Sequence, residues 1–220
     1  MLFEAQRMIY AGAFFPEFKE APAWRKSGID ILNREVNVQV YNDGGQFELD
    51  PHYHLAAINI FCKALGIADV NGFRNEFPQE YLDTIEKMIM FYANISFPDY
   101  TNPCFSDAKI TEKKEMLKNY RAWSKLFPKN ETIKYLATDG KEGALPDYMS
   151  KGFLKSGFFV FRNSWGMDAT QMVVKAGPKG FWHCQPDNGT FEMWFNGKNL
   201  FPDSGSYAVS YTHLTLPTKL

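Results

Sequence analysis

Two polar side chains near the C-terminal end of the sequence have types and spacing suited to proton transfer and metal binding. His183 and Gln185 lie in a segment where polar and aromatic residues alternate. Side chains two residues apart in an extended strand share a face, so this segment predicts that His183 and Gln185 point the same way. Asn196-Gly197 favours a hairpin turn, which would bring Asp203 back alongside them. A histidine, an amide and a carboxylate would then share one sheet surface.

A second segment with unusual chemistry lies far upstream, where a glycine-rich turn precedes a predicted helix. The helix is expected to begin near Pro51, because proline suits the first helical turn. Tyr53 lies in this first turn, between His52 and His54. A free tyrosine has a pKa of about 10, so Tyr53 is a natural proton donor and must be perturbed to act as a base near neutral pH.

Together the two segments resemble the heparinase II/III family of polysaccharide lyases. The resemblance rests on the order and separation of the tyrosine and histidine motifs, and it extends over nearly the whole chain. It implies β-elimination beside a uronic acid, in which the C5 proton leaves, the C4 oxygen departs and an unsaturated sugar remains. Such a reaction needs a base, an acid and a group that neutralises the substrate carboxylate. Heparan sulfate or a similar uronate-containing glycosaminoglycan is the implied substrate.

The resemblance assigns the catalytic roles to Tyr53 and His183. Nearby positive charge and hydrogen bonds would lower the pKa of Tyr53 if it acts as the base, and as a phenol it could instead protonate the leaving oxygen. His183 would act as a base from the opposite face of the sugar, which would serve the other uronate epimer. The asparagine that neutralises the carboxylate in the family would fall just before Met1, so we expect the chain to lack it.

Other residues of the two motifs are expected to bind substrate or metal. The expected substrate-binding residues, which precede or flank Tyr53, are Gln46, Glu48, His52 and His54. Gln185 and Asp203 correspond to the family's metal ligands and suit a structural divalent cation, Ca²⁺ first and Zn²⁺ as the alternative. A third ligand is expected beyond the end of the chain, which leaves this site incomplete. Asp203 could equally be a turn residue, and residues 102–107 form a second candidate cleft loop.

Charge and cysteine content limit the classes of partner that the chain could bind. The net charge of −1 does not itself indicate a polyanion-binding protein, although basic residues outnumber acids five to one between Lys151 and Lys179. That excess could attract an acidic glycan, and a solvated basic face is an equal alternative. The three cysteines form neither a CxxC motif nor a disulfide framework. No apolar stretch approaches the length of a membrane span. We expect an acidic polysaccharide as partner, no nucleic acid, no membrane insertion and a monomeric parent.

Apolar residues at helical spacing predict successive helices over the first two thirds of the chain. The first is predicted only as far as Glu35, because Val36, Val38 and Val40 alternate like a strand. In the next helix, Gly66 is a natural stop. A bundle, a solenoid or an α/α toroid would fit this periodicity, and the resemblance selects the toroid.

The expected fold class is α+β and multidomain. Residues 1–138 are expected to form the C-terminal part of an α/α toroid, and residues 139–151 a linker rich in glycine and proline. Residues 152–208 are expected to begin an antiparallel β-sandwich, with strands near 158–161, 172–174 and 191–195. Residues 209–220 resemble translated adaptor sequence and are expected to be a non-native tail.

Three functions remain open. The first is β-elimination of heparan sulfate or a related glycosaminoglycan, the second an alginate-type lyase on the same scaffold, and the third a glycan-binding homologue without catalysis. The chain is expected to be an internal fragment, inactive on its own, of a periplasmic or secreted bacterial enzyme.

Overall fold

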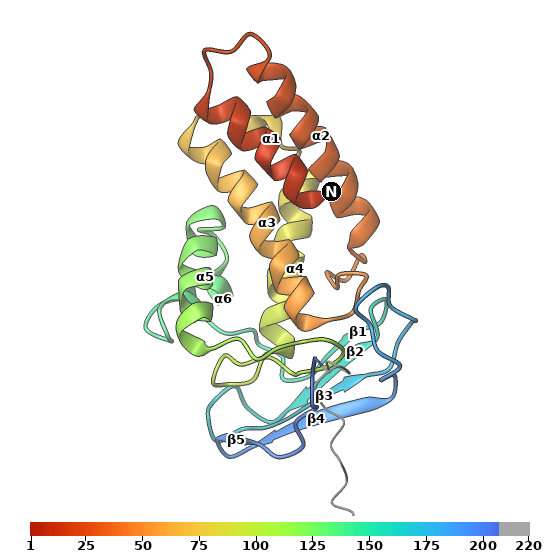
Figure 1. Ribbon diagram of the computed structural model, residues 1–220. Coiled ribbons are helices and arrows are strands. Elements are labelled where there is room, and N and C mark those ends of the chain that lie inside the picture. The colour runs from red at the N-terminus through yellow and green to blue at the C-terminus, as the bar shows by residue number, and fades with distance from the viewer. Residues whose placement is uncertain (207–220) are drawn as a thin grey trace, which may run out of the picture.

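A layer of helices stands on one face of an antiparallel sheet in the computed structural model, which describes residues 1–206 (Figure 1). The suspected non-native tail, residues 209–220, lies outside the described part. The helices are α1 (Leu2–Phe14), α2 (Ala21–Gln39), α3 (Pro51–Val70), the short 3₁₀ helix η1 (Arg74–Glu76), α4 (Gln79–Ile95), α5 (Lys113–Leu126) and α6 (Glu131–Ala137). The strands are β1 (Lys151–Phe153), β2 (Phe158–Arg162), β3 (Thr170–Lys175), β4 (Thr190–Phe195) and β5 (Lys198–Asn199). Helices followed by an antiparallel sheet confirm the α+β class.

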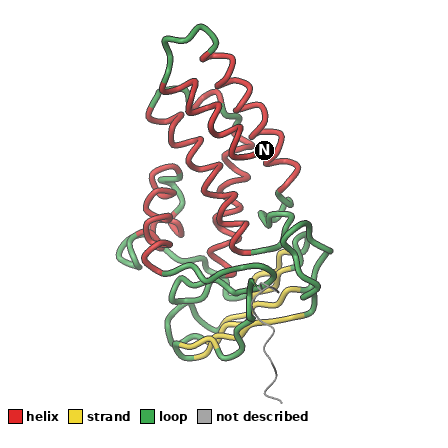
Figure 2. Tube along the Cα trace, in the orientation of Figure 1, coloured by secondary structure: helices red, strands yellow, loops and turns green. Residues whose placement is uncertain are grey.

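The sheet is a meander in which each strand pairs with the next along the chain, in the order β1-β2-β3-β4-β5. Figure 2 shows its strands gathered beneath the helices. The three strands expected from the sequence fall within β2, β3 and β4. The predicted hairpin turn is confirmed, because Asn196 and Gly197 link β4 to β5 with positive φ angles of 44° and 86°, as a two-residue hairpin requires.

Two of the predicted helix ends are wrong. α2 continues past Glu35 to Gln39, and only Val40 forms a β-bridge, with Gln46. The helix persists because Val36 is buried while Val38 points to solvent, as on one helix face. α3 continues through Gly66 to Val70. A glycine inside a helix costs only about 1 kcal/mol, which the burial of the apolar residues around it offsets.

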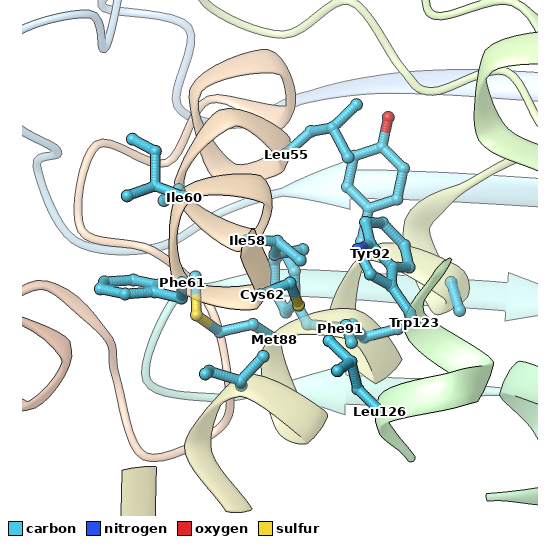
Figure 3. Close-up of a cluster of buried hydrophobic side chains, with 14 of the residues drawn as sticks. Leu55, Ile58, Ile60, Phe61, Cys62, Met88, Phe91, Tyr92, Trp123 and Leu126 are labelled. Atoms are coloured by element: carbon cyan, nitrogen blue, oxygen red, sulfur yellow. The ribbon is translucent and has the colours of Figure 1, made fainter. Parts of the chain in front are cut away.

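α3 is the central helix of the hydrophobic core. The sequence predicted this helix but did not reveal its central position. The helix is long and apolar enough to cross a membrane by length and composition alone, contrary to the expectation that no segment would be. Its apolar side chains are instead buried against α4 and α5, where Phe61 lies beside Met88 (Figure 3). Burial inside the protein therefore accounts for the hydropathy of α3.

Asp50 fixes the start of α3 and with it the position of Tyr53. Its Oδ1 accepts hydrogen bonds from the backbone nitrogens of His52 (2.7 Å) and Tyr53 (3.0 Å), and Pro51 occupies the first helical position. A side-chain cap of this kind satisfies amide groups that have no partner within the helix. Asp50 is buried, and this burial raises its pKa from 3.8 to about 6, against the lowering effect of the backbone donors.

The two faces of the sheet differ in composition, because the face toward the helices combines apolar core residues with buried polar groups and the outer face is apolar. The face toward the helices buries polar groups: Arg162 donates to the backbone oxygen of Asn94, and Gln171 Nε2 donates to that of Ser96 at 2.9 Å. The other face is apolar, although β-sheets usually turn polar residues toward water. Its exposed aromatic side chains are Phe161, Phe191 and Phe195.

Substitutions on the two sides of β2 should show which face of the sheet is exposed and which is packed against the helices. Phe161 is 49% exposed and Phe158 is 1% exposed. We expect Phe161→Ser to change the free energy of unfolding of the 220-residue chain by less than about 1 kcal/mol and to reduce binding of a hydrophobic dye. Phe158→Ser should cost at least about 3 kcal/mol. Denaturant titration and dye fluorescence measure both effects. Equal destabilisation by the two substitutions would contradict the assignment of faces.

The buried cap should make stability depend on pH. Because the folded pKa of Asp50, about 6, exceeds the unperturbed 3.8, its contribution to stability is complete below pH 3.8 and is lost as the pH rises through 6. Compared with the Asp50→Asn variant, the unsubstituted 220-residue chain should lose roughly 3 kcal/mol of unfolding free energy between about pH 3 and pH 7. Urea titrations of both proteins measure this difference. The other titrating groups are the same in both proteins, so their contributions to the pH dependence cancel. A difference that does not change with pH would refute the assignment.

Candidate active site

The rings of Tyr53 and His183 stack face to face, with centroids 3.6 Å apart and planes 9° from parallel. Tyr53 extends from the first turn of α3, and His183 from the connection between β3 and β4. The fold thus brings together the two motifs that the sequence singled out. One belongs to the helical layer and the other to the sheet, so their contact depends on how these two layers dock.

The His183 segment is not the strand that the sequence predicted. The backbone turns at residues 181–184, where the Cys184 nitrogen donates to the Phe181 oxygen at 3.0 Å and Trp182 has a φ of 42°. His183 and Gln185 nevertheless reach the same partner. His183 Nδ1 lies 3.3 Å from Asp107 Oδ2, and Gln185 Nε2 donates to Asp107 Oδ1 at 2.8 Å. They share a side because the chain wraps around Asp107 and not because a strand alternates.

Asp107 is the site residue that sequence reasoning missed. It lies in the loop between α4 and α5, within the segment that had been considered only as a second cleft loop. When His183 Nδ1 donates to this carboxylate, Nε2 keeps its lone pair free to accept a proton. No spacing rule connects Asp107 to the histidine motif, so only the folded structure shows the pair.

A buried network holds the two loops together. Lys175 Nζ contacts Asp187 Oδ1 at 2.6 Å and Ser106 Oγ at 2.5 Å. The Ser106 nitrogen donates to Asp187 Oδ2 at 2.6 Å, and the Gln185 nitrogen donates to Ser106 Oγ at 3.3 Å. These contacts join β3, the connection that carries His183 and the loop that carries Asp107.

The charges around Tyr53 oppose the expected lowering of its pKa. Burial raises the pKa of Tyr53, and the neighbouring acids Asp50, Asp107 and Glu48 raise it further. The expectation of nearby positive charge is therefore not met by the described residues. In this environment the Tyr53 phenol keeps its proton near neutral pH.

The stacked rings also change the expected arrangement of acid and base. No sugar ring fits between two aromatic rings whose centroids are 3.6 Å apart. This structure therefore leaves no room for a substrate between Tyr53 and His183.

The four expected substrate-binding residues differ in accessibility. His54 is 2% exposed, its Nδ1 accepts from the Gln46 nitrogen at 3.2 Å, and its Nε2 lies 2.9 Å from the Met88 oxygen. Burial lowers the pKa of His54 to about 4. This geometry gives His54 a structural role in holding the Gln46 loop against α4. Gln46 is also buried, and its Oε1 accepts from the Glu48 nitrogen at 3.0 Å.

Glu48 and His52 lie closer to the surface. Both are half-buried, and burial raises the pKa of Glu48 while lowering that of His52. The charge of His183 acts on Glu48 in the opposite direction, which places Glu48 near the stacked pair. Each side chain has one buried polar atom without a hydrogen-bond partner among residues 1–206, Glu48 Oε2 and His52 Nδ1.

The expected metal ligands do not form a complete site within residues 1–206. In this described part, no group of three or more His, Cys, Asp or Glu side chains is placed to hold a metal ion. Gln185 uses its amide nitrogen to bind Asp107, and Asp203 Oδ1 accepts from the Gly205 nitrogen at 2.9 Å, as a turn residue does. Two ligands do not complete a metal centre among the described residues, so no chemical step is derived through one.

Family sequence models match both parts of the chain. One described as heparinase II/III N-terminus matches residues 1–135, and one described as heparinase II/III-like, C-terminal, matches residues 146–216. A heparin-sulfate lyase from Bacteroides stercoris is 90% identical over 96% of this chain and 32% of its own length. Another, from Pedobacter heparinus, is 51% identical over 95% of this chain and 32% of its own length.

Solved structures agree in fold. A heparinase III structure is 98% identical, with a TM-score of 0.92 over 95% of this chain and 33% of that one. The heparan sulfate lyase of Pedobacter heparinus is 51% identical, with a TM-score of 0.88 over 95% of this chain and 33% of that one. The chain spans about a third of the length of these relatives. From its sequence and its fold, the chain belongs to the heparinase II/III family.

Proposed function

We propose that this chain carries part of the active site of a lyase that cleaves heparan sulfate, or a related uronate-containing glycosaminoglycan, by β-elimination. The stacked pair of Tyr53 and His183 is the observation that carries the proposal, because it places a proton donor beside a proton acceptor. Relatives named heparin-sulfate lyase, 90% and 51% identical, support the substrate class.

In the proposed reaction the two side chains divide the proton transfers. His183 Nε2 accepts the C5 proton, because Nδ1 is directed at Asp107. The C5–H electrons form the C4–C5 double bond, the bond from C4 to the glycosidic oxygen breaks, and Tyr53 donates its phenolic proton to that oxygen. The raised pKa of Tyr53 suits this role of acid. Neutralisation of the uronate carboxylate falls to an asparagine outside this chain.

Both transfers occur on one side of the sugar ring in this scheme. The stacked rings support that arrangement, because two rings with centroids 3.6 Å apart lie on the same side of any sugar bound next to them. Elimination from one side requires the C5 proton and the leaving oxygen to lie on the same face of the sugar. The epimer of the uronate that satisfies this condition is the one that we propose as substrate.

The described fold is proposed to be part of a larger assembly. The antiparallel helix layer is proposed to be the C-terminal part of an α/α toroid. The apolar outer face of the sheet, with Phe161, Phe191 and Phe195, supports a β-sandwich, in which a second sheet would cover these side chains. A crystal structure of the full-length parent with that face open to solvent would refute the sandwich.

A structural divalent cation is proposed for the same full-length parent. Gln185 and Asp203 would supply two ligands, and a third would come from outside the described residues. Oxygen donors favour Ca²⁺, and a histidine as third ligand would favour Zn²⁺. We further propose that the parent is a monomer located in the periplasm or outside the cell, which cell fractionation and gel filtration would test.

The absorbance of the unsaturated uronate tests the reaction directly. We expect the full-length parent to produce a rise in ultraviolet absorbance on heparan sulfate. Tyr53→Phe keeps the stacked ring but removes the acidic proton, so it should lower kcat by about 10²-fold or more. His183→Ala should lose the base, with a loss of similar size.

The same assay separates the alternatives. Product from alginate but not from heparan sulfate would favour an alginate-type lyase. No product from any uronate polymer, together with glycan binding that survives Tyr53→Phe, would establish a binding protein without catalysis. Product formation by the 220-residue chain alone would show that the upstream asparagine is dispensable.

Removal of metal tests the proposed cation. A chelator should lower the melting temperature of the full-length parent, because an ion bound only by the folded state stabilises that state. Asp203→Ala should lower the melting temperature in the absence of the chelator. The chelator should then cause no further decrease in this variant. Metal analysis of the purified protein would identify the ion. An unchanged melting temperature, with no bound metal detected, would exclude it.

A further inference from the structure

Trp182 is placed where a large apolar side chain is unfavourable. It is 85% exposed, and it directly precedes His183 in the turn beside the stacked pair. Tryptophan side chains contribute most to stability when they are buried. The indole is therefore displayed directly beside the candidate catalytic residues.

The backbone of Trp182 is also unfavourable. Its φ of 42° lies in the left-handed region, which glycine and asparagine adopt readily and bulky residues rarely do. Such a conformation costs about 1–3 kcal/mol, and it is characteristic of binding and catalytic sites. Exposure and backbone strain thus coincide at one residue.

The support beneath Trp182 is well held. The Phe181 nitrogen donates to the Phe47 oxygen at 3.3 Å, and the rings of these two residues stack at 5.1 Å. Gly180 packs so closely on Cys184 and the Glu48 backbone that an added Cβ would clash, at 2.6 Å and 2.9 Å. The turn therefore displays the indole from a fixed position, so little order has to be gained when a ligand binds.

Trp182 and Tyr53 line one open groove of about 290 Å³. The groove is also lined by the Gln46–Glu48 segment, by residues on one side of α3 and by the first three residues of the chain. The groove thus runs from the candidate acid to the exposed indole. A chain-like substrate held at Tyr53 would pass over Trp182 next.

The chemistry of the groove selects the occupant. The flat apolar face of an indole packs well against the C–H face of a pyranose ring. The Glu48 carboxylate accepts hydrogen bonds from hydroxyl groups and repels sulfate and carboxylate groups. The groove therefore suits a sugar ring that presents hydroxyls and no anionic group to Glu48.

We propose that Trp182 is the stacking platform of a subsite for an uncharged sugar face, adjacent to the uronate at Tyr53 and His183. This inference rests on the proposed function, because the sugar chain is the proposed substrate. It adds a substrate-binding residue that provides affinity and takes no part in proton transfer.

Binding measured without turnover tests the subsite. The full-length parent carrying Tyr53→Phe would be titrated with heparan sulfate oligosaccharides by calorimetry, alone and combined with Trp182→Ala, Trp182→Phe or Val70→Ala. Val70 is equally exposed, but it lies at the far end of α3, about 30 Å away. We expect Trp182→Ala to raise Kd about fivefold or more, Trp182→Phe to stay within about twofold, and Val70→Ala to have no effect.

A kinetic measurement distinguishes this subsite from catalysis. In the parent with Tyr53 intact, Trp182→Ala should raise KM by a similar factor and leave kcat within about twofold. The subsite would be overturned by an unchanged Kd for Trp182→Ala or by an equal loss of affinity in Trp182→Phe. It would also be overturned if the full-length parent carrying only Tyr53→Phe bound no oligosaccharide. A parent that binds oligosaccharide through Trp182 but forms no unsaturated product would refute the proposed reaction and keep the subsite.

Discussion

The candidate site depends on a buried polar network, centred on an ion pair, that fastens the connection carrying His183 to the loop carrying Asp107. Lys175 is almost fully buried and bonds both Asp187, in the connection that carries His183, and Ser106, in the loop that carries Asp107. Burial of two charges removes their hydration, so such a pair adds little to overall stability. Its directional contacts instead determine where the connection lies, which an apolar cluster of the same size would not.

The face of the sheet toward the helices combines apolar core residues with an unusual number of buried polar side chains. Arg162, Gln171, Lys175 and Glu192 are all buried on the side of the helices, where backbone and side-chain partners satisfy most of their polar atoms. A polar interface of this kind aligns the layers in a single orientation, since a shift would leave buried groups without partners. The apolar side is left available for packing against a further layer.

Long patterned segments were predictable from the sequence, and contacts between loops were not. The apolar stripes of α3, α4 and α5, the strands β2 to β4 and the Asn196-Gly197 hairpin all follow from local spacing. The extension of α2 was missed because burial of Val36 against neighbouring helices overrides a local alternation. Asp107 was missed for a different reason: its link to His183 joins distant segments, and no periodicity encodes such a contact.

The two stacked rings belong to parts of the chain with different resistance to heat. Tyr53 extends from α3, whose apolar residues belong to the main hydrophobic core, whereas His183 is held by loops and a few polar bonds. Local opening requires less energy where few apolar contacts are lost. On warming, the connection that carries His183 would therefore detach while α3 remains folded. Thermal inactivation of such an enzyme would precede the loss of its helical circular dichroism, and cooling would restore the site without refolding the core.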